Sequence, residues 1–262
     1  MRFDGKRVVV TGASSGIGRA TAVAFVAAGA RVIATARSES RLRSLAAELG
    51  GPPRLTPLVA DVTDAASVGT MAARVLQDGG APDIVVANAG IGLDALLVET
   101  SEEALKSVFE TNVYGVVRTL RCFVPGMVAR GSGRLVLVSS VVGKRGIPHY
   151  SIYSGSKFAL HGIADALRAE LSGSGVSVGV VCPASTETEF ADRRLREGPR
   201  QKPVRPGRHT PESVARAILR MAGSRRREMV LTPEGKALAW ANVFLPGVLD
   251  RFLARMLVGR KT

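Results

Sequence analysis

Short runs of apolar residues alternate along this chain with longer segments in which apolar residues recur every three or four positions. The short runs predict buried strands, and the longer segments predict amphipathic helices. The predicted strands cover residues 8–10, 31–36, 54–60, 83–87, 133–139, 176–182 and 228–231. The predicted helices cover residues 16–28, 38–49 and 64–77, one or two segments within 100–130, then 153–171 and 211–222.

The predicted strands are apolar throughout, which is typical of a parallel sheet covered by helices on both faces. Right-handed crossovers leave few topologies for such a sheet. The favoured fold is an α/β, doubly wound parallel sheet of about seven strands in the order 3-2-1-4-5-6-7. We expect a single domain over residues 1–235 and a helical C-terminal extension over residues 236–262 that packs on it.

The composition fits one large folded core. Of the 262 residues, 46% are hydrophobic and 22% charged, which excludes intrinsic disorder. Two cysteines, Cys122 and Cys182, are too few for a disulfide framework or a four-cysteine metal site, so we expect a reducing, cytoplasmic compartment. We expect neither a secretory signal nor a spanning helix, because charges interrupt the N-terminus and no apolar run is long enough.

Positive charge dominates the sequence, with 36 Lys and Arg against 22 Asp and Glu and a formal net charge of +14. Such a balance favours attraction to anions. One Trp and three Tyr offer few surfaces on which nucleobases stack, so we interpret the basic residues as solvated surface and expect no nucleic-acid partner. Residues 191–209, rich in Arg, Pro and Gly, predict a mobile loop.

The C-terminal segment combines apolar and basic residues. Residues 237–257 hold many large apolar side chains, and Arg260 and Lys261 follow. Three roles compete: a lid over a substrate site, an oligomer contact, and an interfacial helix on a membrane surface. We favour packing on the protein itself over membrane contact.

A glycine-rich loop lies between the first predicted strand and the first predicted helix. Residues 11–18 read TGASSGIG, a G-x-x-x-G-x-G pattern. Gly12 permits a tight turn, Gly16 lets the backbone approach a pyrophosphate, and Gly18 allows close helix–strand packing. Free N–H groups at a helix N-terminus bind phosphate. Taken alone, the loop could also be an ordinary glycine-rich turn. Together with the motifs described below, it predicts a dinucleotide site in a Rossmann-like fold.

The residue after the second predicted strand indicates which dinucleotide binds. An acid there binds the adenosine ribose of NAD, whereas a basic residue accommodates the 2′-phosphate of NADP. Arg37 occupies this position, so NADP(H) is favoured over NAD(H), the alternative being an Arg that only lies in solvent. Further candidates for cofactor contact follow other strands: Ser14, Asp61, Val62, Asn88, Ala89 and Gly90.

Tyr153 and Lys157 lie one helical turn apart, on one face of the helix after the fifth predicted strand. A nearby ammonium favours phenolate, so we expect the pKa of Tyr153 to fall below its usual value near 10 and the phenol to donate a proton. By itself, a Tyr and a Lys at this spacing are more often neighbours on a helix surface than a catalytic pair. Ser139 and Ser140 end the fifth strand at the carboxyl edge, where such folds bind ligands.

Residues 6–231 resemble the short-chain dehydrogenase/reductase family in its NADP(H)-preferring form. The resemblance is carried by residues 11–18, Asp61, Asn88-Ala89-Gly90, Asn112, Ser140, Tyr153 and Lys157. It implies that Tyr153 is the acid/base, that Lys157 holds the nicotinamide ribose, and that Ser140 binds the substrate oxygen. Asn112 would position a relay water. The implied cofactor contacts are Gly12, Ser14, Ser15, Gly16, Ile17, Gly18, Arg37, Asp61, Val62, Asn88, Ala89, Gly90, Tyr153, Lys157, Pro183, Thr186 and Thr188.

The resemblance implies NADPH-dependent reduction of a ketone or aldehyde to an alcohol, a small-molecule substrate, and a homodimer or homotetramer. Ala184 stands where the family usually has Gly after Pro183, which affects nicotinamide placement. Two alternatives stay open: a catalytically silent dinucleotide-sensing or binding protein, and a membrane-surface reductase of lipid or steroid type. The three histidines lack ligand spacing, so we expect no metal site.

Overall fold

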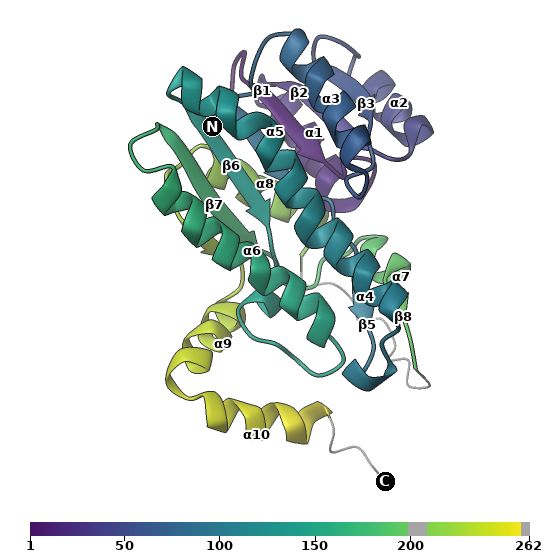
Figure 1. Cartoon of the computed structure of the whole chain (residues 1–262), viewed down its shortest axis with the longest axis vertical. Coiled ribbons are helices and arrows are strands. Elements are labelled where there is room, and N and C mark those ends of the chain that lie inside the picture. Colours follow the sequence, from purple (N-terminus) through teal and green to yellow (C-terminus); the bar gives the residue numbers. More distant parts are fainter. Residues whose placement is uncertain (199–208, 258–262) are drawn as a thin grey trace.

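The computed structural model describes residues 1–198 and 209–257 and shows helices on both faces of a parallel sheet (Figure 1). The described sheet has seven strands in the order β3-β2-β1-β4-β6-β7-β9. The expected doubly wound fold and strand order are therefore confirmed. In chain order the strands are β1 (Arg7–Thr11), β2 (Arg31–Ala36), β3 (Leu55–Val59), β4 (Ile84–Ala87), β6 (Gly133–Val138), β7 (Val176–Cys182) and β9 (Glu228–Val230).

The centre of the sheet is buried on both faces. Val10 of β1 pairs with Ala34 of β2 on one side and with Val86 of β4 on the other. Val8 and Val10 belong to one core, while Val9 between them belongs to the other. Because neighbouring residues of a strand point to opposite faces, a continuous apolar run supplies both cores at once.

Each core is closed by three helices. One face is covered by α1 (Gly16–Ala27), α2 (Glu39–Glu48) and α8 (Pro211–Ala222). The other is covered by α3 (Ala65–Gln77), α5 (Gly115–Arg130) and α6 (Ser151–Glu170). The helices α3 and α8 begin where the sequence offers caps: the Asp64 carboxylate accepts from the Ala66 N–H at 2.8 Å, and Thr210 caps α8. Phe25 and Phe123 are the largest fully buried side chains of the two cores.

Smaller elements gather beyond the carboxyl ends of the strands. They are η1 (Leu97–Glu99), α4 (Glu102–Phe109), the π-helical turn η2 (Glu110–Tyr114), η3 (Val141–Gly143) and α7 (Phe190–Arg193). A second, two-stranded sheet pairs β5 (Leu93–Asp94) with β8 (Leu195–Arg196). The prediction of a loop over 191–209 is wrong for residues 191–196, because α7 and the pairing of Leu195 with Leu93 order them. Residues 199–208 lie outside the described ranges.

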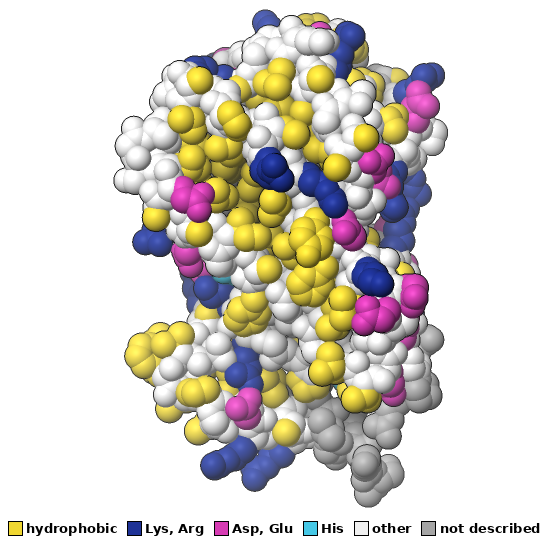
Figure 2. Space-filling view, in the orientation of Figure 1, with side chains coloured by type: hydrophobic (Ala, Val, Ile, Leu, Met, Phe, Trp, Pro, Cys, Tyr) yellow, Lys and Arg dark blue, Asp and Glu magenta, His cyan; other side chains and the backbone are white. Residues whose placement is uncertain are grey.

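Two helices, α9 (Pro233–Phe244) and α10 (Pro246–Leu257), follow the last strand. They lie at the lower end of the molecule in Figure 1, and apolar side chains gather over α9 in Figure 2. Within the described ranges, no helix combines the length and hydropathy that crossing a bilayer requires. The domain boundary after residue 235 stays a prediction.

Candidate active site

The glycine-rich loop leaves the N-terminus of α1 open to an anion. Ser15 is the N-cap, its side chain makes no capping hydrogen bond, and the first turn of α1 carries no acidic residue. Gly12 and Gly16 have φ values of +67° and +51°, which favour glycine. A Cβ on Gly18 would collide with the carbonyl oxygen of Gly12. The backbone N–H groups at this turn therefore fit a pyrophosphate.

Asn88 holds this loop in place. Its side-chain amide donates to the carbonyl oxygen of Thr11 at 2.9 Å, while the Thr11 hydroxyl accepts from the backbone N–H groups of Asn88 and Ala89 at 3.0 and 3.1 Å. The end of β4 is thereby tied to the end of β1. In the structure, the Asn88 amide therefore shapes the loop. This role is additional to the cofactor contact that the sequence led us to expect.

The expected adenosine end of the dinucleotide site combines an exposed cation with a capped turn. Arg37 follows β2, is exposed, and makes no hydrogen bond or ion pair with any residue the structure describes. The Asp61 carboxylate accepts from the N–H and hydroxyl of Thr63 at 2.9 and 2.8 Å, and Val62 is buried. Arg37 is therefore available to a phosphate, whereas the described contacts of Asp61 fix its own turn.

The segment after β7 crosses in front of the glycine-rich loop. The Pro183 carbonyl accepts from the Val141 N–H at 2.9 Å, and the Thr186 hydroxyl donates to the Ala184 carbonyl at 3.0 Å. The side chain of Thr188 lies against Gly16, where an added Cβ would come within 3.1 Å of it. The sequence-predicted residues Gly16 and Thr188, which lie far apart in the sequence, are thus close together.

Four predicted catalytic residues converge at the carboxyl edge of β4 and β6. Tyr153 and Lys157 lie one turn apart on α6, with the Lys157 Nζ 5.8 Å from the Tyr153 ring centroid. Ser140, just after β6, hydrogen-bonds Tyr153. Asn112 lies in the π-helical turn, and its amide contacts the N–H and carbonyl of Ile91 at 2.8 and 2.9 Å. Such turns often occur at functional sites.

Gly90 shows how closely these groups approach. A Cβ added there would lie 3.0 Å from the Asn112 Oδ1 and 3.3 Å from the Lys157 Nζ. The Lys157 ammonium donates to the carbonyl of Val138 at 3.1 Å. Side chains from η2 and α6 therefore meet beside the glycine that follows β4, and Lys157 also binds the end of β6.

Burial shifts the pKa values of both members of the Tyr–Lys pair. The pKa of Tyr153 is raised to about 12, because burial disfavours phenolate by more than the Ser140 hydrogen bond and the Arg194 charge favour it. Burial lowers the pKa of Lys157 to about 8. The expected lowering of the Tyr153 pKa by Lys157 is therefore wrong for this arrangement of side chains, because burial dominates and the favourable charge that acts on Tyr153 is that of Arg194. Tyr153 remains a protonated donor at neutral pH.

A polar cluster beside Tyr153 was missed in the sequence. The Tyr150 hydroxyl donates to the Asp94 carboxylate at 3.1 Å and accepts from the Arg194 guanidinium at 2.6 Å. Asp94 is buried, and the Phe190 ring lies 6.0 Å from the Tyr153 ring. The cluster joins β5, α6 and the segment after α7, which are far apart in sequence. No local spacing indicates it.

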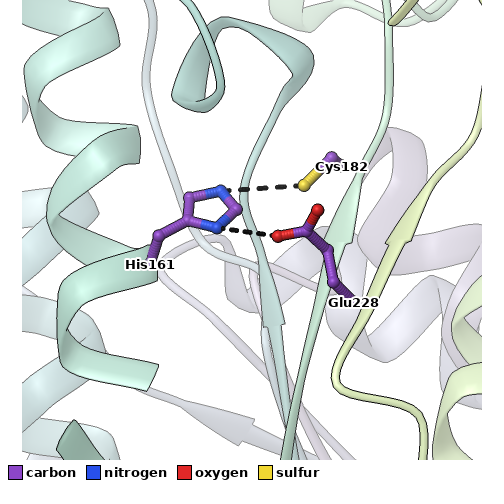
Figure 3. A group of neighbouring side chains, drawn as sticks. All are labelled: His161, Cys182 and Glu228. Carbon is purple, nitrogen blue, oxygen red and sulfur yellow. Dashed lines mark hydrogen bonds and ion pairs between the residues drawn. The ribbon is translucent and has the colours of Figure 1, made fainter. Parts of the chain in front are cut away.

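His161 lies one turn beyond Lys157 and links α6 to β7 and β9 (Figure 3). Its Nδ1 is 3.2 Å from Glu228, and its Nε2 is 3.7 Å from the Cys182 sulfur. Zinc accepts this set of residue types. However, Figure 3 shows the two ring nitrogens facing different partners, and the Lys144 ammonium lies 2.9 Å from the Glu228 carboxylate. We interpret the cluster as a clamp between elements; the absence of a metal stays a prediction.

The Glu228→Gln variant should be less stable than the parent near neutral pH. In the parent protein, the hydrogen bond with His161 and, to a smaller extent, that with Lys144 lower the pKa of the Glu228 carboxyl to about 2. A lowered pKa stabilises the fold above the unfolded-state value, and this contribution disappears as pH falls towards 2. We expect a loss of about 1 kcal/mol in the free energy of unfolding, allowing for solvent screening. Urea unfolding at neutral and acidic pH measures it, with Glu170→Gln as control; a loss that persists in acid contradicts the argument.

The doubly wound sheet and its glycine-rich first β–α turn define the Rossmann-like class of α/β proteins. The family model described as short chain dehydrogenase matches residues 6–198. The chain therefore belongs to the short-chain dehydrogenase/reductase family of oxidoreductases, which confirms the family resemblance found in the sequence, while the preference for NADP(H) stays a prediction.

Curated relatives agree with this assignment. The chain is 39% identical over 227 residues to the 3-oxoacyl-[acyl-carrier-protein] reductase FabG of Thermotoga maritima, covering 85% of this chain and 92% of the relative. It is 35% identical over 238 residues to the dehydrogenase/reductase SDR family member 7B of Xenopus laevis, covering 86% of this chain and 73% of the relative. The family likeness therefore extends over most of each protein.

Solved structures extend the likeness to the C-terminal helices. A short-chain dehydrogenase from Streptomyces avermitilis is 32% identical with a TM-score of 0.83, and 99% of both chains is covered. A short-chain dehydrogenase from Burkholderia cenocepacia in complex with NADP is 25% identical, with a TM-score of 0.83 and 97% and 99% covered. A family member from Burkholderia phymatum in complex with NAD is 27% identical, with a TM-score of 0.77 and 94% and 96% covered. Both dinucleotides thus occur among similar structures.

Proposed function

We propose that this chain reduces a ketone or aldehyde to an alcohol with NADPH, by reversible hydride transfer. The convergence of Ser140, Tyr153 and Lys157 beside the open N-terminus of α1 is the observation that carries the proposal. The glycine-rich loop would hold the pyrophosphate, and Arg37 the 2′-phosphate. When bound, the nicotinamide supplies the hydride.

The side chains at the edge of β6 supply the proton chemistry. Ser140 and Tyr153 donate hydrogen bonds to the substrate oxygen, on which negative charge develops. Tyr153 is protonated at neutral pH because burial raises its pKa, and it gives its proton to that oxygen. Lys157 and Asn112 meet near Gly90, where they would hold a water that returns the proton.

The proposal includes a cytoplasmic location and a homodimer or homotetramer formed through α5 and α6. Both cysteines are free, in keeping with a reducing compartment. Tyr114, Val128 and Phe158, in η2 and on α5 and α6, expose large apolar side chains that a second copy would cover.

The test of the reaction is the loss of NADPH absorbance in the presence of a panel of small ketones and aldehydes. Turnover of panel members, with formation of the matching alcohol, supports the proposal. Tight nucleotide binding without turnover across aliphatic, aromatic and acyl-thioester carbonyls contradicts it and favours a dinucleotide-sensing protein.

The Arg37→Asp variant should prefer NADH over NADPH. The exposed guanidinium would lose a charge-assisted contact with the 2′-phosphate, and the new carboxylate would repel that phosphate while accepting from the ribose hydroxyls of NAD. We expect the ratio of kcat/KM for NADPH to that for NADH to fall about thirtyfold. Steady-state kinetics with both cofactors measure it, with Arg31→Asp at the opposite end of β2 as control. An unchanged ratio refutes this use of Arg37.

A further inference from the structure

The outer side of α9 and α10 is an apolar surface. Its six large side chains are each 48–69% exposed: Trp240, Val243, Phe244, Leu245, Val248 and Phe252. The Trp240 and Phe244 rings lie 4.8 Å apart, one helical turn from each other. Figure 2 shows apolar side chains gathered at the lower left of the molecule, where Figure 1 places α9. Soluble monomers rarely expose so large a contiguous group without a binding role.

The inner side of the same helices already has its partners. Leu249 is buried, and the Arg145 guanidinium donates to Asn242 at 2.7 Å and pairs with Asp250. The Asn242 amide donates to the carbonyl of Lys144 at 3.1 Å. These contacts fix which side of α9 and α10 faces the body, so the apolar side faces outward as part of the folded arrangement.

Basic side chains accompany the apolar ones. Arg251 and Arg255 are exposed one turn apart on α10, beside Phe252, and Lys236 is exposed on α9. Asp250, the one acidic residue of α10, is paired with Arg145. The whole chain carries a net charge of +14, and its last residues include Arg260 and Lys261. An apolar helix face with a basic border is complementary to an anionic bilayer surface.

We propose that α9 and α10 dock this protein on the surface of an anionic lipid bilayer, with both helices lying in the plane of the interface. Trp240, Phe244 and Phe252 enter the boundary between headgroups and acyl chains. Arg251 and Arg255 extend along that boundary and pair with lipid phosphates.

A second copy of the chain fits this surface less well. A two-fold interface places the same patch of both copies in contact. It would enclose Arg251 and Arg255 of both copies in one interface, where the one acidic residue of α10, Asp250, is already paired with Arg145. Like charges enclosed together disfavour that pairing, whereas lipid phosphates neutralise them.

Trp240 reports on docking directly, because it is the only Trp in the chain. We expect its fluorescence to shift to the blue and to be quenched by brominated acyl chains when vesicles of phosphatidylcholine and phosphatidylglycerol are added. Vesicles of phosphatidylcholine alone should bind more weakly, and high salt should release the protein from anionic vesicles. The measurement needs no substrate or cofactor, so its result is independent of whether the protein has the proposed reductase activity.

Two variants separate the apolar and basic contributions. Phe252→Ser should lower the partition coefficient about tenfold by removing one buried ring. The Arg251→Gln, Arg255→Gln double variant should lower it about twentyfold on anionic vesicles and little on neutral ones. Both changes are at exposed positions, so the fold should persist, as circular dichroism checks. Leu76→Ser on α3, at the other end of the molecule, is the matched control.

The proposal is overturned if no vesicle shifts the fluorescence of Trp240. It is also overturned if the shift appears without vesicles, grows with protein concentration, and accompanies an oligomer that Phe252→Ser dissociates, because the occupant is then a second copy. A shift that is equal on neutral and anionic vesicles and insensitive to salt contradicts the role of the arginines.

Discussion

The Tyr153→Phe variant should reduce its carbonyl substrate at least about a hundredfold more slowly than the parent enzyme. The substitution removes only the hydroxyl that hydrogen-bonds Ser140, so the ring and its neighbour Phe190 remain. The substrate oxygen then lacks both a hydrogen-bond donor and a proton source as charge develops on it. The loss should fall on kcat, with the KM for NADPH nearly unchanged.

Steady-state kinetics at saturating NADPH test this expectation. Tyr114→Phe is the matched control, because that hydroxyl is on an exposed ring in the π-helical turn. It should retain parental turnover. If Tyr153→Phe turned over equally fast, Tyr153 would not be the acid, and the proton would have to come from another group or from water.

The parts of the fold that the sequence predicted are those set by local pattern and two-sided burial. Val8, Val9 and Val10 show why: a strand with every residue buried indicates a sheet covered on both faces, as parallel sheets are. The glycine-rich loop also left a local signal, since Gly12 and Gly16 have positive φ and Gly18 packs against the Gly12 carbonyl, although distant residues such as Asn88 and Thr188 crowd the same glycines.

What the sequence did not predict depends on contacts between distant segments. Residues 191–196 were predicted as loop, yet Leu195 pairs with Leu93 about a hundred positions earlier. Asp94, Tyr150 and Arg194 form one cluster only after β5 and α6 are packed together. Neither pairing leaves a periodic signal in the chain.

The pKa of Tyr153 illustrates the same limit for chemistry. Helical spacing correctly placed Lys157 one turn away, but spacing does not reveal burial. Burial raises the pKa, and the cation that partly offsets this rise is Arg194, which no helical spacing indicates. Residue spacing therefore predicted which groups meet, whereas their protonation depends on the packed surroundings.

The Lys157→Met variant should lower kcat/KM by about a hundredfold to a thousandfold, because it removes the ammonium that would hold the nicotinamide ribose and restore the proton to Tyr153. Burial lowers the pKa of Lys157 to about 8, so the parent activity should fall as pH rises through that value and the ammonium loses its proton.

The Lys157→Arg variant tests whether the positive charge of residue 157, as distinct from the shape of the Lys side chain, accounts for this predicted effect. Its guanidinium stays protonated well above pH 8, so the variant should keep part of the activity and show no decline near pH 8. Profiles of kcat/KM against pH for the parent, Met and Arg enzymes measure this. A decline near pH 8 that persists in Lys157→Arg would assign it to another group. Loss of the decline in both variants, with activity retained only in Lys157→Arg, ties it to the charge one turn beyond Tyr153.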